Sequence, residues 1–246
     1  MLQIKDLTYI VDEGEERKTI IDNLTLDISD GKFTVITGPN GGGKSTLAKL
    51  IAGIIKPTSG SILLDGEDIT DMSITDRALR GISYAFQQPV KFKGLQVFDL
   101  LKIAAGKDTK LSFNDACSYL SEVGLCARDY INREVNASLS GGELKRIEIA
   151  TVLARGTKMS VFDEPEAGID LWSFQNLTRI FENMRENIKE SGIVIISHQE
   201  RILKIADEIV VLADGKIRMQ GEGDKILPQI TGTADAVNPC DRIKGV

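Results

Sequence analysis

Cysteine is scarce in this sequence, and the spacing of its three copies favours no bonded framework. The 246-residue chain holds Cys117, Cys126 and Cys240, an odd number without a C-x-x-C pair. Neither a set of disulfides nor a zinc site is therefore predicted, and a reducing cytoplasm is the expected location. Cys117 and Cys126 flank a predicted helix, where we expect packing thiols, because free cysteine is commonly buried. Cys240 lies in a polar C-terminal stretch, where we expect an exposed thiol that ligates no cluster.

Long apolar segments and an excess of positive charge are also absent. No apolar run approaches the roughly 20 residues that cross a bilayer, and the start Met1–Lys5 lacks the basic-then-apolar order of a signal peptide. Direct membrane insertion is thus not expected. The 30 basic and 36 acidic residues give a net charge of −6, which argues against a general nucleic-acid-binding surface. The hydrophobic content of 42% supports a sizeable core, so we expect a single domain over residues 1–246.

The clearest positive signal is a glycine-rich loop with the spacing G-x-x-x-x-G-K-[ST]. It runs from Gly38 to Thr46 directly after the apolar segment Phe33–Thr37, and residues 44–53 follow with the pattern of a helix. In such a loop the backbone N–H groups and the helix N-terminus hold phosphates, the lysine contacts the terminal phosphates, and the serine ligates Mg²⁺. The sequence therefore predicts a site for a polyphosphate and Mg²⁺ formed by Gly38, Asn40, Gly41, Gly43, Lys44, Ser45 and Thr46.

Hydrophobic periodicity predicts an α/β chain whose strands are interrupted by a helical stretch. Strands are expected at 2–10 and 20–28, which form a hairpin, and at 32–37, 58–66 and 81–86. Helices are expected at 95–105, 114–123 and 142–154, without a convincing strand among them. Consecutive apolar residues at 159–163 and 192–197, with a helix at 171–190 between them, are typical of a parallel sheet covered on both faces. A hairpin at 209–219 follows.

These elements predict an ATP-binding α/β core with one insertion. The core comprises residues 1–87 and 157–220, begins with an antiparallel β subdomain, and contains a parallel central sheet. The inserted α-helical subdomain comprises residues 88–156. The tail at 221–246 is polar, and its pattern assigns no element.

Two acidic residues follow the predicted strand at 159–163. A carboxylate at the end of a parallel strand beside the phosphate loop is well placed to hold Mg²⁺, which makes Asp163 a metal ligand. The following Glu164 is placed to orient or deprotonate the attacking water. The alternative is that Asp163 to Pro165 only caps the next helix.

A second motif lies 20 residues before Asp163. The segment Leu139–Glu143, Leu-Ser-Gly-Gly-Glu, resembles the signature motif of ATP-binding-cassette (ABC) ATPases, and the resemblance covers residues 2 to 220. It implies a P-loop NTPase core of ABC type that hydrolyses ATP as a head-to-tail homodimer. In that arrangement Ser140 and Gly142 of one chain close over the γ-phosphate that Lys44 of the other chain holds.

Three further family motifs match single residues of this chain. Gln87 matches the glutamine of the Q-loop, which contacts Mg²⁺ and water and links the core to the helical subdomain; Gln88 is the adjacent alternative. Asp170, at the end of Glu166–Asp170, matches the D-loop aspartate at the dimer interface. His198, the single histidine, matches the switch histidine that contacts the γ-phosphate. The resemblance thus implies Glu164, His198 and Gln87 as catalytic residues, and Ser45, Gln87 and Asp163 as metal ligands.

The site for the adenine base departs from the family pattern. Family members stack the base on an aromatic residue near the N-terminal hairpin. Alignment of the strand that contains Tyr9 places this side chain in the core and Val11 at the stacking position. We therefore expect weak discrimination between ATP and GTP.

The client of the ATPase is suggested by a narrower resemblance. The segments Gln87–Gly94, Leu139–Arg146 and Asp163–Asp170 resemble SufC-type ATPases of the SUF iron–sulfur cluster assembly machinery, although the residues after Glu143 and Glu164 differ from the bacterial pattern. The resemblance implies a SufB-like scaffold protein as partner. The alternative is the ATP-binding subunit of a membrane importer, with permease subunits as partners.

Either client has a predicted docking point. Phe92, between Lys91 and Lys93, offers an apolar contact inside a basic rim, and a solvated loop is the alternative. A DNA-organising ATPase is disfavoured, because residues 47–139 leave no room for a long coiled coil. A non-hydrolysing ATP-binding module is disfavoured, because Glu164 and His198 are both present.

Overall fold

The computed structural model describes residues 1–14, 16–106, 109–187 and 190–232. The prediction for Cys240 therefore lies outside the described residues. In chain order the strands are β1 (Leu2–Glu13), β2 (Glu16–Ile28), β3 (Phe33–Thr37), β4 (Ser59–Leu64), β5 (Glu67–Asp68), β6 (Ile82–Ala85), β7 (Met159–Asp163), β8 (Gly192–Ile196), β9 (Glu208–Ala213) and β10 (Lys216–Glu222). The helices are α1 (Lys44–Ala52), α2 (Ile74–Leu79), α3 (Val97–Ala105), α4 (Phe113–Glu122), α5 (Ala127–Tyr130), α6 (Gly141–Arg155), α7 (Leu171–Asn187), α8 (Glu200–Lys204) and α9 (Gly223–Thr231).

The first sheet is antiparallel and has the order β2-β1-β4-β5. Alternating apolar residues of β1 and β2 face inward, so that Leu2, Ile4 and Leu26 are buried while their neighbours reach solvent. β1 pairs with β2 and β4 on its two sides. The predicted N-terminal hairpin and antiparallel β part are confirmed.

The second sheet has the order β10-β9-β3-β8-β7-β6 and holds the predicted parallel strands. All residues of β3, β7 and β8 are buried, because helices or the first sheet cover both faces. β9 is parallel to β3, and only β10 runs antiparallel, as part of the predicted closing hairpin. The sheet is therefore mostly parallel, and the carboxyl ends of β3, β6, β7 and β8 lie along one edge.

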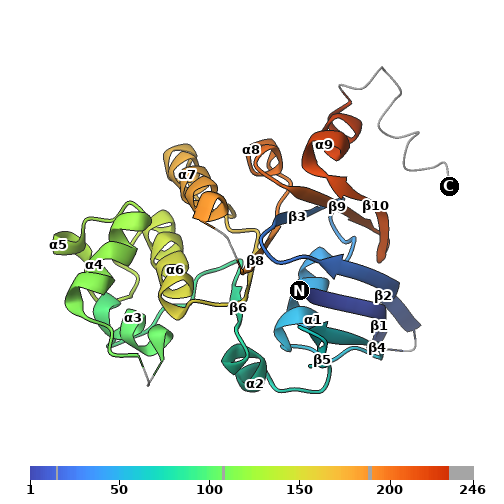
Figure 1. Cartoon of the computed structure of the whole chain (residues 1–246), viewed down its shortest axis with the longest axis horizontal. Helices are drawn as coiled ribbons and strands as arrows, with labels where there is room; N and C mark the ends of the chain where they lie inside the picture. The colour runs from blue at the N-terminus through green and yellow to red at the C-terminus, as the bar shows by residue number, and fades with distance from the viewer. Residues whose placement is uncertain (15, 107–108, 188–189, 233–246) are drawn as a thin grey trace.

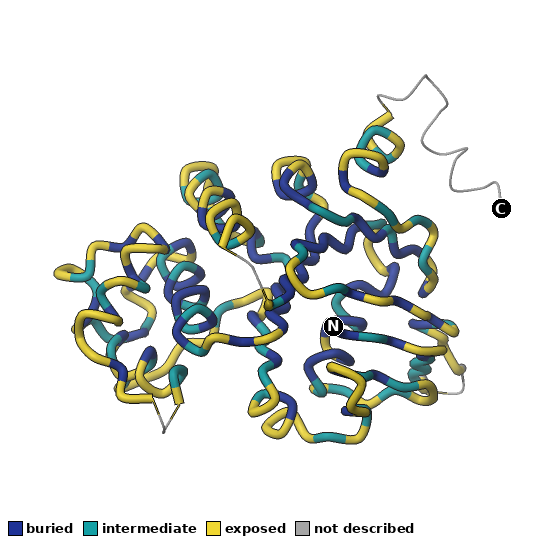
Figure 2. The backbone as a smooth tube through the Cα atoms, in the orientation of Figure 1, coloured by how far each residue is buried: buried dark blue, intermediate teal, exposed yellow. Residues whose placement is uncertain are grey.

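Helix α1 lies between the two sheets (Figure 1). Its residues Leu47, Leu50 and Ile51 share a buried cluster with Ile4 of the first sheet and Ile36 of the second. The other face of the second sheet packs against α6, α7 and α8 in a separate buried cluster. Figure 2 shows the buried residues concentrated where these layers meet.

The end of α1 is capped by a buried arginine. Arg77 of α2 is 1% exposed, and its Nη1 donates hydrogen bonds to the carbonyls of Leu50 at 2.6 Å and Ile51 at 2.8 Å. Its Nη2 donates to the Thr70 carbonyl at 2.7 Å. The guanidinium thus adds donors at the end of α1, where the Leu50 carbonyl also accepts from the Gly53 N–H at 3.2 Å, and it opposes the negative end of the helix dipole.

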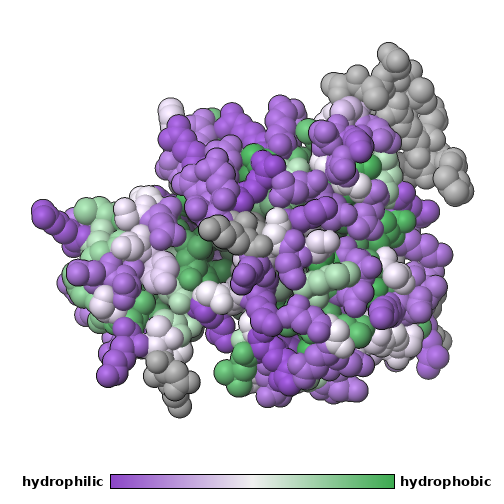
Figure 3. All heavy atoms as spheres, viewed as in Figure 1, coloured by the Kyte–Doolittle hydropathy of each residue, from purple (hydrophilic) through white to green (hydrophobic). Residues whose placement is uncertain are grey.

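Helices α3 to α6 follow β6 in the sequence and form the lobe at the left of Figure 1. Their apolar faces meet in the buried cluster that includes Leu101, Leu120 and Ile147. Most of the visible face is hydrophilic, and apolar side chains reach the surface over this lobe and where it joins the strands (Figure 3). The predicted helices are present, and α2, α5, α8 and α9 are additional.

One expectation about this lobe is wrong. Cys117 is half-buried against the core of the lobe, as predicted, but Cys126 is exposed. Cys126 occupies the N-cap position of α5, which turns its side chain to solvent. Within the residues that the structure describes, no helix combines the length and apolar character needed to cross a bilayer.

Candidate functional site

The phosphate loop joins the end of β3 to the start of α1 and rests on the β9–β10 hairpin. Gly38 and Gly43 have φ angles of 136° and 99°, in the region that favours glycine. A Cβ on Gly38 would lie 2.0 Å from the carbonyl oxygen of Leu212, so no side chain fits there. The Gly215 N–H donates to the Gly42 carbonyl at 3.2 Å. The hairpin therefore sets the shape of the loop.

Lys44 is the first residue of α1 and folds back over the loop. Its Nζ donates hydrogen bonds of 2.9 Å to the carbonyls of Gly38 and Pro39. Burial lowers the pKa of Lys44, and the nearby carboxylates of Glu164 and Asp163 oppose this shift. The ammonium is thus held at the loop, close to the acidic pair.

The remaining loop residues differ in exposure. Asn40 and Gly41 are exposed at the tip, and Ser45 and Thr46 are half-buried in the first turn of α1. The loop leaves backbone N–H groups and a helix N-terminus free to face an anion, which fits a polyphosphate.

Two of the three predicted metal ligands, Ser45 and Asp163, meet at the carboxyl end of β7. The third, Gln87, contacts Glu164 instead. Ser45 Oγ donates a hydrogen bond of 2.9 Å to Asp163 Oδ1. Tyr84 Oη donates one of 2.8 Å to Asp163 Oδ2. The Ser45 hydroxyl and the Asp163 carboxylate thus bring oxygen atoms from two elements together. Oxygen atoms are the ligands that Mg²⁺ takes alongside phosphate oxygens.

Tyr84 was missed as a member of the site. Its burial and the Asp163 carboxylate raise the pKa of Tyr84, so the phenol stays protonated and acts as a donor. β6 and β7 are parallel with Tyr84 beside Val161, which brings the phenol to Asp163. The two residues are 79 positions apart, and only the pairing of the two strands could have indicated the contact.

Gln87 and Glu164 are in direct contact. Gln87 Nε2 donates a hydrogen bond of 2.7 Å to Glu164 Oε2, and Gln88 has no such contact among the described hydrogen bonds. Glu164 has a φ of 43°, and its N–H donates to the Ile196 carbonyl at 3.0 Å. This sharp turn directs the Glu164 side chain away from the strand and towards the loop that follows β6.

His198 directly follows Ser197, which forms a buried pair with Glu166 that the sequence does not indicate. Ser197 is fully buried, and its hydroxyl donates a hydrogen bond of 2.5 Å to Glu166 Oε1. The other oxygen of Glu166 has no partner among the described residues, and burial raises the pKa of this carboxyl group. The imidazole of His198 is exposed at the same edge of the sheet. Glu166 thus links the segment after β7 to the segment after β8.

Ser140 caps α6 and lies beside the segment that contains Asp170. Its hydroxyl accepts a hydrogen bond from the Glu143 N–H at 3.2 Å, and the Glu143 carboxylate accepts one from the Ser140 N–H. A Cβ on Gly142 would lie 2.4 Å from Ser173 Oγ, so this glycine allows α6 and α7 to meet. Asp170 accepts hydrogen bonds from the first turn of α7, which lower the pKa of its carboxyl group.

The structure does not bring the signature motif to the phosphate loop of the same chain. Among the described residues, no hydrogen bond or ion pair joins Ser140 or Gly142 to the segment Gly38–Thr46. Ser140 is instead exposed at the start of α6. A contact between Ser140 and a phosphate bound to a second copy of the chain stays a prediction.

Helix α6 also holds the strand end that precedes Gln87. Lys145 Nζ donates to the Phe86 carbonyl, and the Phe86 N–H donates to Glu148 Oε1 at 3.0 Å. Lys145 is 2% exposed, and burial raises the pKa of Glu148. Two side chains of the signature helix thus fix the backbone next to Gln87.

The candidate base-binding residues lie on β1. Tyr9 packs against the buried cluster between the two sheets, as expected. Val11 is half-buried opposite Lys18.

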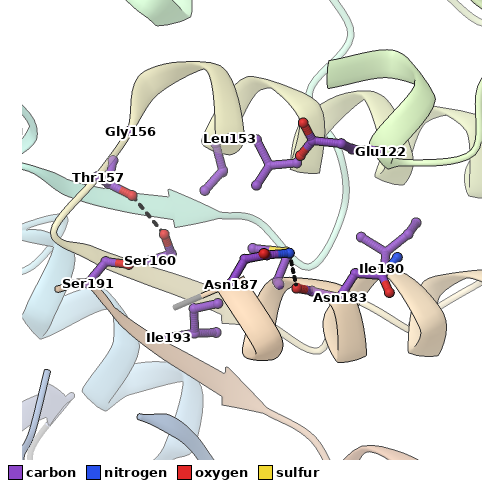
Figure 4. A pocket seen from close by; sticks show the side chains of 12 residues that line it. Glu122, Leu153, Gly156, Thr157, Ser160, Ile180, Asn183, Asn187, Ser191 and Ile193 are labelled. Carbon is purple, nitrogen blue, oxygen red and sulfur yellow. Dashed lines mark hydrogen bonds between the residues drawn. The ribbon is translucent and has the colours of Figure 1, made fainter. Parts of the chain in front are cut away.

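A cavity of about 300 Å³ lies elsewhere, between α6 and α7. Figure 4 shows its lining, which includes Thr157, Ser160 and Asn187. Ser160 stands near the start of β7, whereas Asp163 ends that strand, so this cavity is separate from the nucleotide site. Thr157 and Ser160 are bonded to each other at 2.7 Å, and Asn187 is bonded to the Asn183 carbonyl at 2.8 Å.

Comparisons with known proteins agree with this geometry. The family model described as ABC transporter matches residues 21–167. An uncharacterized ABC transporter ATP-binding protein of Methanocaldococcus jannaschii is 33% identical over 92% of this chain and 90% of its own length. An energy-coupling factor transporter ATP-binding protein of Clostridium acetobutylicum is 33% identical over 93% of this chain and 82% of its own.

A solved structure has the same fold. It is a dimeric ATP-binding cassette in a post-hydrolysis state, bound to ADP and Pi, with a TM-score of 0.80 and 25% identity over 90% of this chain and 98% of its own. The predicted ABC-type α/β fold and the predicted ATPase activity are confirmed. The chain belongs to the ABC transporter family, as an ATP-hydrolysing cassette.

Proposed function

We propose that this chain is the Mg²⁺-dependent ATPase subunit of a membrane transport system. The observation that carries the proposal is the 2.7 Å hydrogen bond between Gln87 and Glu164. It ties the candidate hydrolytic carboxylate to the first residue of an exposed loop. A client that moves this loop therefore changes the position of Glu164, and hydrolysis in turn acts on the client.

Each residue of the site has a role in ATP hydrolysis. Lys44 and the N–H groups of the loop bind the phosphates, and Ser45 and Asp163 would hold Mg²⁺. The metal supplies charge neutralisation on the transferred phosphoryl group. Glu164 accepts the proton of the attacking water, Gln87 orients that water, and His198 contacts the γ-phosphate.

The complete site needs two copies of the chain. Ser140 lies on an exposed end of α6, away from Lys44 of the same chain. In a head-to-tail pair, Ser140 and Gly142 of each copy close over the γ-phosphate bound to the other copy, and Asp170 lies at the contact between them. The dimeric state of the solved relative supports this arrangement.

The client surface lies directly after β6. Phe86, Val90 and Phe92 are 40%, 45% and 37% exposed, and the ammonium groups of Lys91 and Lys93 flank them. An apolar centre with a charged rim is typical of a protein-binding surface. A permease segment with apolar and acidic side chains matches it.

A second candidate client is a soluble SufB-like scaffold in iron–sulfur cluster assembly. It is supported by the resemblance of Gln87–Gly94, Leu139–Arg146 and Asp163–Asp170 to SufC-type ATPases. The transporter names of both relatives described above favour the membrane client. Both candidates use the same ATPase cycle and the same docking surface.

The test of the client uses the chain with Glu164→Gln, which retains ATP. We expect this variant to form a stable dimer with ATP and Mg²⁺ and to co-purify with a membrane protein of many spans. Recovery of a soluble scaffold protein instead would support the second candidate. A variant that stays monomeric with ATP and hydrolyses it at the parental rate would contradict the two-copy site.

Base selectivity is a separate part of the proposal. Tyr9 packs against the cluster between the sheets, so the aliphatic Val11 is the side chain on which the base would stack. We expect similar KM values for ATP and GTP. A strong preference for ATP would contradict this part alone.

A further inference from the structure

Two large apolar side chains are exposed at the start of α7. Leu171 is 63% exposed and Trp172 is 75% exposed. Trp172 is the single tryptophan of the chain. Leu79 and Ile103 are as exposed, at 78% and 63%, so exposure alone does not indicate a partner. Leu171 and Trp172 differ from them because they adjoin each other and lie beside the signature motif.

The backbone under these side chains is rigidly held. The Asp170 carboxylate accepts hydrogen bonds from the N–H groups of Trp172 at 2.9 Å and Ser173 at 3.0 Å. The Ser173 hydroxyl donates a further one of 2.7 Å to the same carboxylate. The exposure of Trp172 is therefore a property of an ordered first helical turn and does not result from a frayed end.

This turn forms one continuous surface with the signature motif. A Cβ on Gly142 would lie 2.4 Å from Ser173 Oγ, and a Cβ on Gly141 would lie 3.4 Å from the Gly168 carbonyl oxygen. The N-terminal ends of α6 and α7 thus touch, with Ser140 on one and Trp172 on the other. Any macromolecule that brings a phosphate to Ser140 also approaches Leu171 and Trp172.

We propose that a second copy of this chain covers Leu171 and Trp172 in the ATP-bound dimer, with Trp172 as the main apolar anchor of the contact. This inference rests on the two-copy site proposed above and adds the residues that hold the two copies together. A two-fold interface uses each patch twice, so one tryptophan contributes two contacts. Tryptophan is enriched among the residues that dominate interface energies.

The apolar contact also opposes the electrostatic repulsion between two copies. Each copy carries a net charge of −6, and the ATP phosphates add further negative charge where the copies meet. Repulsion between them opposes association, and salt screens this repulsion. Burial of an apolar pair on each copy opposes this repulsion without adding charge.

The test uses the Glu164→Gln chain, so that ATP is not consumed. With ATP and Mg²⁺, we expect the emission of Trp172 to shift to shorter wavelength and its quenching by acrylamide to fall. Under excitation that tryptophan absorbs and the four tyrosines do not, the emission reports this one position. In sedimentation, Trp172→Ala in the same background should raise the dimer dissociation constant by about 30-fold, which is the range of an interface hot spot.

The matched control is Arg179→Ala, an exposed residue further along α7. It should leave the dissociation constant unchanged. Circular dichroism and the midpoint of thermal unfolding should be the same for both variants, because neither side chain is buried.

The outcomes separate this inference from the proposed function. If the Glu164→Gln chain dimerises with ATP but the emission of Trp172 does not change, or if Trp172→Ala dimerises equally well, the anchor is wrong and the two-copy site stands. If the Glu164→Gln chain stays monomeric at all ATP concentrations, the two-copy site is wrong and the anchor with it.

Discussion

Lys145 and Glu148 lie on consecutive turns of α6, with Lys145 Nζ 3.3 Å from Glu148 Oε2. Both side chains are hydrogen-bonded to the backbone of Phe86. Lys145 meets the carbonyl and Glu148 meets the N–H of that residue. Gln87 comes next in the chain and is bonded to Glu164. A continuous series of hydrogen bonds therefore leads from the signature helix to the candidate catalytic carboxylate.

Loss of either Lys145 or Glu148 alone should lower the free energy of unfolding. Lys145→Met leaves the half-buried Glu148 without its cation, and we expect a loss of about 3 kcal/mol in the free energy of unfolding. The double variant Lys145→Met, Glu148→Leu should recover part of this loss, because no buried charge remains. Urea unfolding measures both. Lys102→Met, on the exposed side of α3, should change stability by less than about 0.5 kcal/mol.

Tyr84 should set the affinity of the site for Mg²⁺. Its phenol donates to Asp163 Oδ2 and holds the carboxylate in place beside Ser45. We expect Tyr84→Phe to raise the Mg²⁺ concentration for half-maximal ATPase activity by about 10-fold, as for other groups that orient a metal ligand. The control Tyr119→Phe, on α4, should leave the Mg²⁺ dependence unchanged. An unchanged value for Tyr84→Phe would show that Ser45 alone orients Asp163.

Glu166 should make stability depend on pH. Burial raises the pKa of its carboxyl group above the ordinary value of 4.5. Below pH 4.5 the folded and unfolded chains both hold the proton. Above it the unfolded chain releases the proton first, so the free energy of unfolding falls as pH rises, until pH passes the folded pKa.

Glu166→Gln removes this dependence and keeps an oxygen for Ser197. Relative to the parent, we expect the variant to gain up to about 1.4 kcal/mol per pH unit within that window, measured by urea unfolding from pH 4 to 8. Glu182→Gln, an exposed change on α7, should show no such gain. Parallel curves for the parent and Glu166→Gln would contradict a raised pKa.

Arg77 should be essential for the stability of the nucleotide-binding half. Arg77→Met removes the buried guanidinium that donates to the carbonyls of Leu50, Ile51 and Thr70, of which Leu50 keeps a bond from the Gly53 N–H. We expect a loss of about 3 kcal/mol in the free energy of unfolding. Arg80→Met breaks an exposed pair with Glu67 and should cost at most about 1 kcal/mol. Equal effects of the two changes would contradict the role of Arg77 as a cap.

The sequence predicts the parts of the fold that depend on local pattern. The strands at Phe33–Thr37 and Gly192–Ile196 are apolar at every position, and the phosphate loop has a fixed spacing, so both are visible in one segment. The sequence pattern does not predict α9, because Pro228 inside it and the glycines at its two ends obscure its short apolar face. The exposure of Cys126 depends on the cap of α5, which its spacing does not reveal.

The parts of the site that the sequence does not predict are contacts between segments far apart in the chain. Tyr84 and Asp163 are 79 positions apart, Lys145 and Phe86 are 59 apart, and Glu166 and Ser197 are 31 apart. The contacts of Asp163 and Ser197 exist because parallel strands end at the same edge of the sheet, and the Lys145 contact exists because α6 packs beside β6. Strand order is decided by packing, and spacing along the chain contains no record of it.

The close approach of Gly38 to Leu212 has a consequence for the synthesis of the protein. The phosphate loop leaves the ribosome early, but β3 takes its place between β8 and β9, and the loop takes its shape from the turn at Gly215. N-terminal segments of a protein begin to fold during synthesis, whereas this loop lacks its support until almost the whole chain is made. A nascent chain that stops before Gly215 should therefore display the nucleotide-binding motif and fail to retain ATP.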